Sequence, residues 1–382
     1  MDLEFSDSEK RFRDDARAWL EANVPRTPLK SGDSREGFAE HVVWEKKLHA
    51  ARWSVVSWPA KYGGRDASLV EWLIFEEEYY RSGAPIRVTQ NGIFLLAPTI
   101  FEFGTEEQKE RILPAMSSAE RLWAQAWSEP EAGSDLASVR SHAERVEGGW
   151  KVYGQKTWTT RGAFCDGIYG LFRTDPNSER HKGLTYLLVD LNQPGVTVRP
   201  VERIDGDESF AEVFLDGAFV PDANVLGGVN QGWKVAMSTT SSERGLSLRS
   251  PGRFMKAADR LVDLYQRRPD PGLRDRVTRA WMDAQLYRLY TFQTVTRMIE
   301  GGEIGADSSL NKIFWSEMDI RLTETALELL GPDAELLGGS PHAVDDGDWM
   351  LDFEFALAGP IYAGTNEVQR NIVAGRVLDL PR

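Results

Sequence analysis

The stretch WKVYGQKTWTTRG, residues 150–162, sets the fold of the middle of this chain. It is short, rich in aromatic and β-branched side chains and closed by glycine, which is the pattern of a β-strand that ends in a turn. Comparable runs follow at close spacing: GIYGLFRT (167–174), GLTYLLVDL (183–191), GVTVRPVERI (195–204) and AEVFLDGAFVP (211–221). No long helical crossover separates them and no GxGxxG occurs, so the pattern predicts an antiparallel, barrel-like sheet and argues against a Rossmann fold.

Helical patterns flank this strand-rich region on both sides. Before it, VVWEKKLHAARW and SLVEWLIFEEEYYRSG carry apolar residues at helical spacing. Ser6 with Glu9 and Thr105 with Gln108 form two capping boxes. After it, the helical period returns from about Gly232. The sequence therefore predicts an α+β protein with a helical N-terminal domain, a middle β-domain and a helical C-terminal domain, at residues 1–119, 120–230 and 231–382.

The composition limits the class of protein. The 382 residues include 45 basic and 59 acidic side chains, a net charge of −14, which argues against nucleic acid or an anionic membrane as a partner. The single cysteine, Cys165, excludes an internal disulfide and favours a reducing cytoplasm. No apolar run approaches about 18 residues, so we expect no membrane span. The five histidines lack the spacing of metal ligands, and we expect no metal site.

Two stretches carry residue types that suit a ligand. In SEPEAGSD (128–135), the turn from Glu131 to Asp135 is rich in backbone and hydroxyl donors and can approach phosphate or carbonyl oxygens. In GQKTWTTRG (154–162), Trp158 offers a flat face to an aromatic cofactor and Thr160 offers a hydroxyl donor. Each stretch has a plainer alternative, an ordinary polar loop for the first and a tryptophan of the sheet core for the second.

Taken in order, these motifs resemble the acyl-CoA dehydrogenase family along nearly the whole chain. The resemblance runs through TEEQKERILPAM (105–116), SEPEAGSD, VYGQKTWTT (152–160), GVNQGWKVAM (228–237) and IYAGTNEVQRNIV (361–373). It implies a C-terminal four-helix bundle, FAD bound between the middle and C-terminal domains, and a dimer or tetramer. It also implies α,β-dehydrogenation of an acyl-CoA thioester to the trans-2-enoyl-CoA, with electrons passed to an electron-transfer flavoprotein.

The resemblance assigns roles to residues at matching positions. Trp127 and Ser128 match a strand that hydrogen-bonds the flavin ring. The residues implied to bind FAD are Trp127, Ser128, Gly133, Ser134, Trp158, Thr160, Thr365 and Glu367. Those implied to bind the substrate are Ser134, Arg244 and Gly364.

The catalytic base is not at its commonest family position. Many relatives carry a glutamate directly after an Ile-Tyr pair, but here that position holds Ala363, whose methyl group accepts no proton. Isovaleryl- and long-chain acyl-CoA dehydrogenases carry the glutamate on a C-terminal-domain helix, directly before an arginine. GWKVAMSTTSSERG (232–245) places Glu243 and Arg244 there, so the resemblance implies that Glu243 is the base. The backbone N–H of Ala363 can still polarise the thioester carbonyl.

Two segments depart from the family pattern. YQRRPDPG (265–272) keeps Arg267 but lacks a Phe-Gly pair, and ELLGPDAELL (328–337) has Glu328, Gly331 and Pro332 where many relatives have Gln-x-x-Gly-Gly. The adenine half of FAD is then held differently or by another chain. Three readings stay open: a homo-oligomeric dehydrogenase, a half-site or non-catalytic subunit of an α2β2 enzyme like those of bacterial steroid degradation, and a flavin oxidase or monooxygenase.

Overall fold

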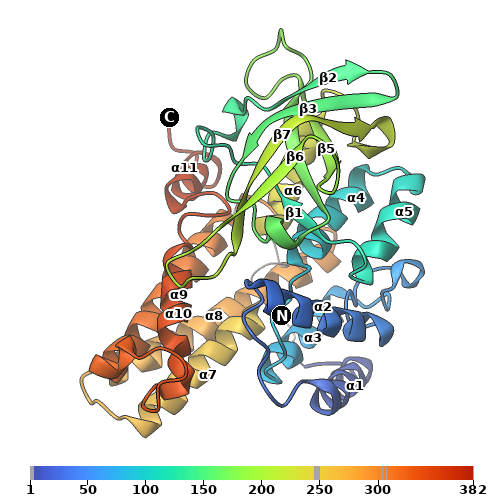
Figure 1. The fold of residues 1–382 in the computed structure, drawn as a ribbon. Helices are drawn as coiled ribbons and strands as arrows, with labels where there is room; N and C mark the ends of the chain where they lie inside the picture. The colour runs from blue at the N-terminus through green and yellow to red at the C-terminus, as the bar shows by residue number, and fades with distance from the viewer. Residues whose placement is uncertain (1–3, 245–249, 303, 307, 382) are drawn as a thin grey trace. The chain divides into compact units, whose positions relative to one another are not determined.

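The computed structural model describes residues 4–244, 250–302, 304–306 and 308–381, and Figure 1 draws it as a ribbon. By its internal contacts the chain divides into two compact units. The first unit joins Met1–Val24 and Ser68–Ala84 to Arg244–Arg382, and the second joins Pro25–Ala67 to Pro85–Glu243. Each unit thus combines segments that lie far apart in the sequence. The boundaries predicted after residues 119 and 230 mark changes of secondary structure, and they stay a prediction.

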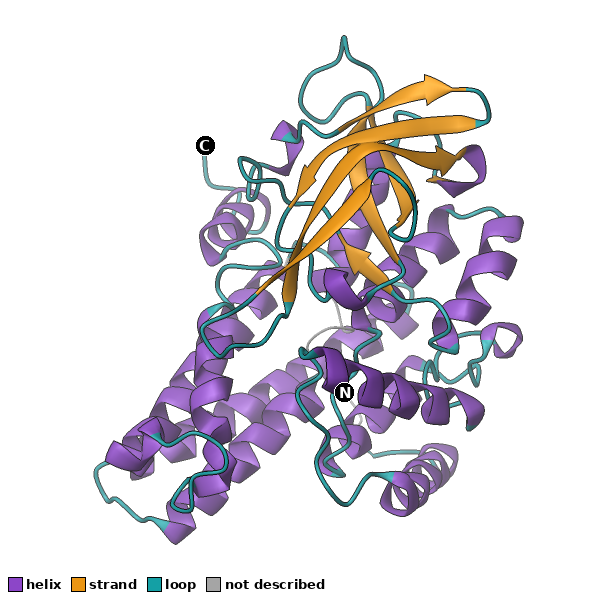
Figure 2. Ribbon diagram, viewed as in Figure 1, coloured by secondary structure: helices purple, strands orange, loops and turns teal. Residues whose placement is uncertain are grey.

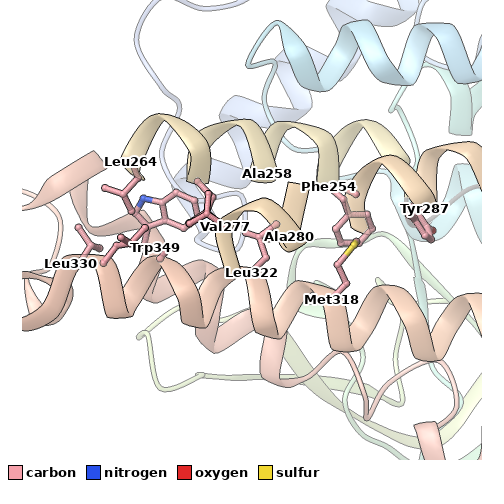
Figure 3. Close-up of a cluster of buried hydrophobic side chains, with 14 of the residues drawn as sticks. Phe254, Ala258, Leu264, Val277, Ala280, Tyr287, Met318, Leu322, Leu330 and Trp349 are labelled. Atoms are coloured by element: carbon pink, nitrogen blue, oxygen red, sulfur yellow. The ribbon is translucent and has the colours of Figure 1, made fainter. Parts of the chain in front are cut away.

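The first unit contains helices and, in its described residues, no strand. The helices are α1 (Asp7–Asn23), α3 (Leu69–Arg81), α7 (Pro251–Arg267), α8 (Arg274–Ile299), α9 (Ser308–Leu330), α10 (Asp348–Leu357) and α11 (Asn366–Arg376). Helices α7 to α10 form the predicted four-helix bundle, in which α7 packs on α8 and α9, and α10 packs on α9. Phe254, Tyr287, Met318 and Trp349 contribute one buried side chain from each of these helices to a shared core (Figure 3).

Ion pairs join α1, α3 and α8 in the same unit. Glu77 of α3 lies 3.0 Å from Arg13 of α1 and 2.5 Å from Arg288 of α8. The next residue, Glu78, accepts two hydrogen bonds from Arg17 at 2.8 and 2.9 Å. These side chains are largely shielded from solvent, so the pairs are worth more than exposed ones and help to fix α1 on α3.

The second unit carries the sheet and four α-helices. The helices are α2 (Arg35–Ala50), α4 (Ala97–Phe103), α5 (Glu106–Ser117) and α6 (Gly232–Arg244), with a π-helical turn η2 (Asn91–Leu96) directly before α4. The strands are β1 (Trp123–Gln125), β2 (His142–Val146), β3 (Gly149–Lys156), β4 (Gly167–Arg173), β5 (Leu184–Asp190), β6 (Val196–Val201), β7 (Phe210–Pro221) and β8 (Val225–Leu226). Figure 2 shows the strands as one twisted sheet.

The sheet is mixed and open, which corrects the antiparallel, barrel-like prediction. The strand order is β6-β7-β3-β2-β4-β5-β8, and most neighbours are antiparallel, but β1 and β2 each pair parallel with β4. The β2–β3 hairpin lies between β1 and β4 in the chain and supplies the crossover that a parallel pair needs. In the described residues no pairing joins β6 to β8. Closure fails because β8 is only two residues long and β6 contains Pro200, which has no N–H to donate.

Both predicted capping boxes are confirmed. The Ser6 hydroxyl accepts from the N–H of Glu9 at the start of α1, and the Thr105 hydroxyl accepts from the N–H of Gln108 at the start of α5. Ser68 caps α3 in the same way. Among the described residues, no helix is both long enough and apolar enough to cross a membrane.

Candidate active site

The residues after β1 lead from the sheet into the first predicted binding stretch. β1 ends at Gln125, so Trp127 and Ser128 lie just beyond the strand in which the sequence places them. The Ser128 carbonyl accepts a hydrogen bond from the Thr157 N–H at 2.9 Å, which ties this segment to the end of β3. The Trp127 indole is buried, and its N–H has no acceptor among the described residues. Buried N–H groups normally have a hydrogen-bond acceptor, so the Trp127 indole N–H is a group to which a bound ligand can supply one.

A buried ion pair supports the same stretch. Lys156 Nζ lies 2.8 Å from Glu129 Oε1 and donates to the Leu171 carbonyl at 3.0 Å. Burial lowers the pKa of Lys156, and the Glu129 carboxylate opposes that effect. Burial alone would raise the pKa of Glu129, but the Lys156 charge and hydrogen bonds from Arg140 and Ser141 outweigh it and lower that pKa. The bond between the two side chains fixes Glu129, the residue next to Ser128.

The turn Glu131–Asp135 presents its backbone and hydroxyl groups to solvent. Gly133 has open space where a Cβ would lie, and Ser134 is exposed. Asp135 pairs with Arg180 at 2.7 Å, which anchors the end of the turn to the loop between β4 and β5. The turn thus has room for a ligand, although an ordinary polar loop stays an alternative.

Trp158 lies on the surface of the second unit, so the alternative of a core tryptophan is wrong. Its side chain is 62% exposed, and its ring meets Phe210 edge to face at a centroid distance of 5.5 Å. The backbone at Trp158 is left-handed, with φ 55°, which is strained for a large side chain. The next residue, Thr159, exchanges two backbone hydrogen bonds with Ala211, at 3.0 and 3.1 Å, and these hold the strained turn in place.

Side chains from other segments fix the end of the Trp158 turn. Arg161 Nε donates to Asp33 Oδ1 at 2.7 Å, and Arg203 approaches the other oxygen of Asp33 at 3.4 Å. The Thr160 carbonyl accepts from Asn91 Nδ2 at 3.3 Å. The turn that carries the exposed indole is therefore rigidly mounted, as a platform for a planar ligand has to be.

Three hydroxyl groups of the second unit are free to bind a ligand. Within the described part of the chain, the hydroxyls of Ser128, Ser134 and Thr160 make no hydrogen bond. All three were predicted from the sequence to contact the flavin or the thioester. A polar ligand at this part of the unit can therefore find donors that the protein itself does not use.

The predicted base lies at the end of α6. Glu243 and Arg244 form the last turn of this helix, which begins at Gly232. Their side chains lie outside the described part of the structure, so their predicted roles stay predictions.

The predicted residues near the C-terminus lie in the first unit: Ala363, Gly364 and Thr365 between α10 and α11, and Glu367 in the first turn of α11. Ala363 and Gly364 are consecutive left-handed residues, with φ 55° and 78°, and the structure gives neither N–H an acceptor among the described residues. Thr365 caps α11 by accepting from the Val368 N–H, and Glu367 is exposed in its first turn. The free amides can bind an anionic or carbonyl oxygen.

Lys156 of β3 is buried, and the sequence motifs did not predict it as part of the site. Lys156 follows Trp150 and Val152 at the two-residue period of a strand, and all three side chains are buried. A lysine at an inward position of a strand is unusual and signals a buried partner. The strand pattern in the sequence could have indicated that Lys156 points inward. It could not have shown that the partner of Lys156 is Glu129.

Three consecutive stretches of this chain match known families of protein domains. Residues 6–120 match the acyl-CoA dehydrogenase N-terminal domain, residues 124–217 the acyl-CoA dehydrogenase middle domain, and residues 230–378 the acyl-CoA dehydrogenase C-terminal domain. The three domains follow one another in the order that the sequence motifs predict.

Individual proteins show the same similarity. The chain is 39% identical to acyl-CoA dehydrogenase IpdE1 of Mycobacterium tuberculosis, across 98% of each chain. Among solved structures it is similar to the Tcur3481-Tcur3483 steroid ACAD, with a TM-score of 0.90 at 27% identity over all of both chains. It is also similar to the ChsE4-ChsE5 complex of Mycobacterium tuberculosis, with a TM-score of 0.85 at 28% identity over all of both chains.

Proposed function

This chain belongs to the acyl-CoA dehydrogenase family of oxidoreductases, and from that premise we propose that it converts an acyl-CoA thioester to the trans-2-enoyl-CoA with FAD as cofactor. The observation that carries the proposal is the match of all three family domains, in order, along one chain. In the reaction a proton leaves the α-carbon, a hydride leaves the β-carbon, and a double bond forms between them.

The second unit offers groups that fit a flavin. Trp158 provides an exposed flat face, Thr160 and Ser128 provide free hydroxyls, and the Trp127 indole N–H is buried with no acceptor among the described residues. With Gly133, Ser134, Thr365 and Glu367 these form the proposed FAD-binding set. Bound FAD supplies the acceptor for the hydride.

Glu243 is the proposed base. Position 363 holds alanine, and Glu243 is the carboxylate at the alternative family position, in the last turn of α6. A carboxylate in a water-poor pocket is suited to take the α-proton of a thioester. Arg244, next to it, is proposed to bind the acyl or pantetheine part of the substrate.

The backbone around Ala363 is the proposed site of the thioester carbonyl. Charge develops on the carbonyl oxygen as the α-proton leaves, and N–H groups aimed at that oxygen stabilise it. The free N–H groups of Ala363 and Gly364 support this role, because the described residues offer them no competing acceptor. Ser134 is the further residue proposed to contact the substrate.

The substrate is proposed to be a steroid-derived or branched acyl-CoA, and the electron acceptor an electron-transfer flavoprotein. The similarity to a steroid ACAD over the full length of both chains supports the substrate class. A purified, flavin-loaded protein, mixed anaerobically with straight, branched and steroidal acyl-CoAs, should lose its yellow colour with at least one of them. A protein that binds flavin but is bleached by none of these thioesters would contradict the proposal.

Glu243→Gln tests the base separately. The amide keeps the shape of the side chain but accepts no proton, so we expect turnover to fall by about 10²–10⁴-fold with flavin still bound. Ala363→Glu in a Glu243→Gly background should restore part of the activity, because it returns a carboxylate to the commoner family position. Near wild-type turnover in Glu243→Gln would show that the base is another group.

A half-site role in an α2β2 assembly is the second candidate. The similarity to the ChsE4-ChsE5 complex favours it, and so do the altered segments at Arg267 and at Glu328–Pro332. A chain that is colourless alone and binds flavin only when co-expressed with a second family member would support this role. Full flavin content and activity in the purified single chain would exclude it.

A further inference from the structure

Buried polar side chains lie beneath the loop that carries Ala363 and Gly364. We call this loop, residues Ala358–Thr365, the tail loop; it joins α10 to α11. The buried residues come from α9 and α11 of the same unit, and each is at most 2% exposed: Lys312, Ser316, Asn366 and Gln369. Burying polar groups is costly unless they are hydrogen-bonded, so their contacts indicate what they hold.

Lys312 clamps the two ends of the tail loop. Its ammonium donates to the Gly359 carbonyl at 2.8 Å, near the start of the loop, and to Asn366 Oδ1 at 2.9 Å, directly after its end. Hydrogen bonds from a charged donor are stronger than those from a neutral donor. The loop also lies close to α9 at Gly359, where an added Cβ would be 3.3 Å from the Cβ of Ser316. The Lys312 ammonium thus bonds both ends of the tail loop to α9.

Asn366 closes the loop on itself. Its backbone N–H donates to the Pro360 carbonyl at 2.9 Å, and its side-chain Nδ2 donates to Ser316 Oγ at 3.1 Å. One residue therefore accepts from Lys312, bridges the two arms of the loop and reaches α9. Loss of Lys312 removes the charged donor that both ends of the loop share, while the bonds of Asn366 to Pro360 and Ser316 remain.

Gln369 orients the middle of the loop. Its Nε2 donates to the carbonyls of Ala363 and Gly364, at 3.3 and 3.2 Å, from a side chain with no exposed surface. In a trans peptide the C=O and the following N–H point in opposite directions. Turning the Ala363 carbonyl towards buried Gln369 therefore turns the Gly364 N–H away from the interior.

We propose that Lys312 and Gln369 are positioning residues that hold the tail loop so that its amides present their N–H groups to the thioester carbonyl oxygen. The inference rests on the proposed function, because it concerns the same amides. Lys312 and Gln369 are the residues that fix these amides. The N–H of Gly364 joins the N–H of Ala363 in binding the thioester carbonyl oxygen. Neither positioning side chain needs to touch the substrate.

The test compares two ligands that differ in one oxygen. The trans-2-enoyl-CoA carries the thioester carbonyl, and the matching S-(trans-2-enyl)-CoA thioether has a methylene group in its place and keeps the double bond; both have the carbon chain of the acyl group that the wild type turns over fastest. Affinities are measured by calorimetry on the flavin-loaded wild type and on Lys312→Met and Gln369→Met, which replace each polar side chain by an unbranched apolar one of similar size. Arg288→Met is the matched control, because it removes a part-buried cation that bonds Glu77 of α3, in the same unit, instead of the tail loop.

We expect the preference of the wild type for the enoyl-CoA over the thioether to fall about five- to tenfold in each positioning variant, since a well-placed hydrogen bond is lost or weakened. We also expect kcat to fall by up to about 10²-fold with little change in KM, while Arg288→Met keeps the wild-type preference. An unchanged preference in the variants that fold, or equal weakening of both ligands, overturns the proposal. If neither variant folds, the side chains are structural and the positioning role is rejected. A wild type that turns over no thioester contradicts the proposed function instead.

Discussion

Replacing Lys156 by methionine removes the ammonium that compensates the buried carboxylate of Glu129. Lys156 Nζ lies 2.8 Å from Glu129 Oε1, and the side chains of Lys156 and Glu129 are 0% and 8% exposed. In the variant the carboxylate keeps hydrogen bonds from the N–H groups of Arg140 and Ser141, at 2.6 and 3.0 Å, but loses the charge beside it. Removing one partner of a buried pair costs about 3–5 kcal/mol. We expect a loss of about 3 kcal/mol in the free energy of unfolding, because two donors remain.

Urea unfolding followed by tryptophan fluorescence measures this loss as a shift in midpoint at constant slope. Lys156→Met combined with Glu129→Gln leaves no buried charge at the pair and should recover most of the stability. Arg145→Met is the matched control: it removes a cation paired with Asp222 on the surface, where both side chains are about half exposed, and should shift the urea midpoint much less than Lys156→Met does. A single variant as stable as this control, or a double variant no better than the single one, would refute the reasoning.

Three further outcomes follow from other features. Glu129 has a pKa below its ordinary value of 4.5, so as the pH falls the unfolded chain takes up the proton first. The stability that Glu129 contributes is present above about pH 4.5 and is lost at lower pH. In Glu129→Gln the urea midpoint should therefore depend less on pH below about 4.5 than it does in the wild type. In Gly154→Ala the new Cβ would lie 2.2 Å from Ser141 Oγ at a φ of 135°, so we expect a loss of about 1–3 kcal/mol that Ser141→Gly partly relieves, both read from urea midpoints. Burial raises the pKa of the Cys165 thiol to about 12, so iodoacetamide should alkylate it at pH 8 much more slowly in the folded protein than in urea; equal rates would contradict this.

The order of helices, sheet and helices could be predicted because it depends on local patterns. The capping boxes at Ser6 and Thr105 each span only four residues of sequence, and the helical period of residues 251–267 is visible without any partner. Closure of the sheet could not be predicted in the same way. Whether β6 meets β8 depends on a pairing between strands more than twenty residues apart, and the direction of β1 depends on where the chain returns.

The candidate site was predicted unevenly for a related reason. Residue types such as Trp158 and Thr160 are legible in the sequence, and the exposed indole agrees with a role as a platform. The groups that hold the platform are not legible, because they come from distant segments: Asp33 reaches Arg161 across 128 positions. The local sequence thus predicts the groups that can face a ligand. The residues that hold those groups in position become known only from the folded structure.

The open sheet has a consequence for how this protein behaves at high concentration. In the described residues β6 pairs with β7 alone, so no strand of the sheet bonds the backbone groups on its other side, and such an edge is where a strand of a second molecule can add. Pro200 removes one donor from that row, and Arg199 places a charge on it. At the opposite end, β8 offers two residues, too few to template a ladder. Neither edge of the open sheet therefore offers a long, unbroken row of backbone donors to a strand of another molecule.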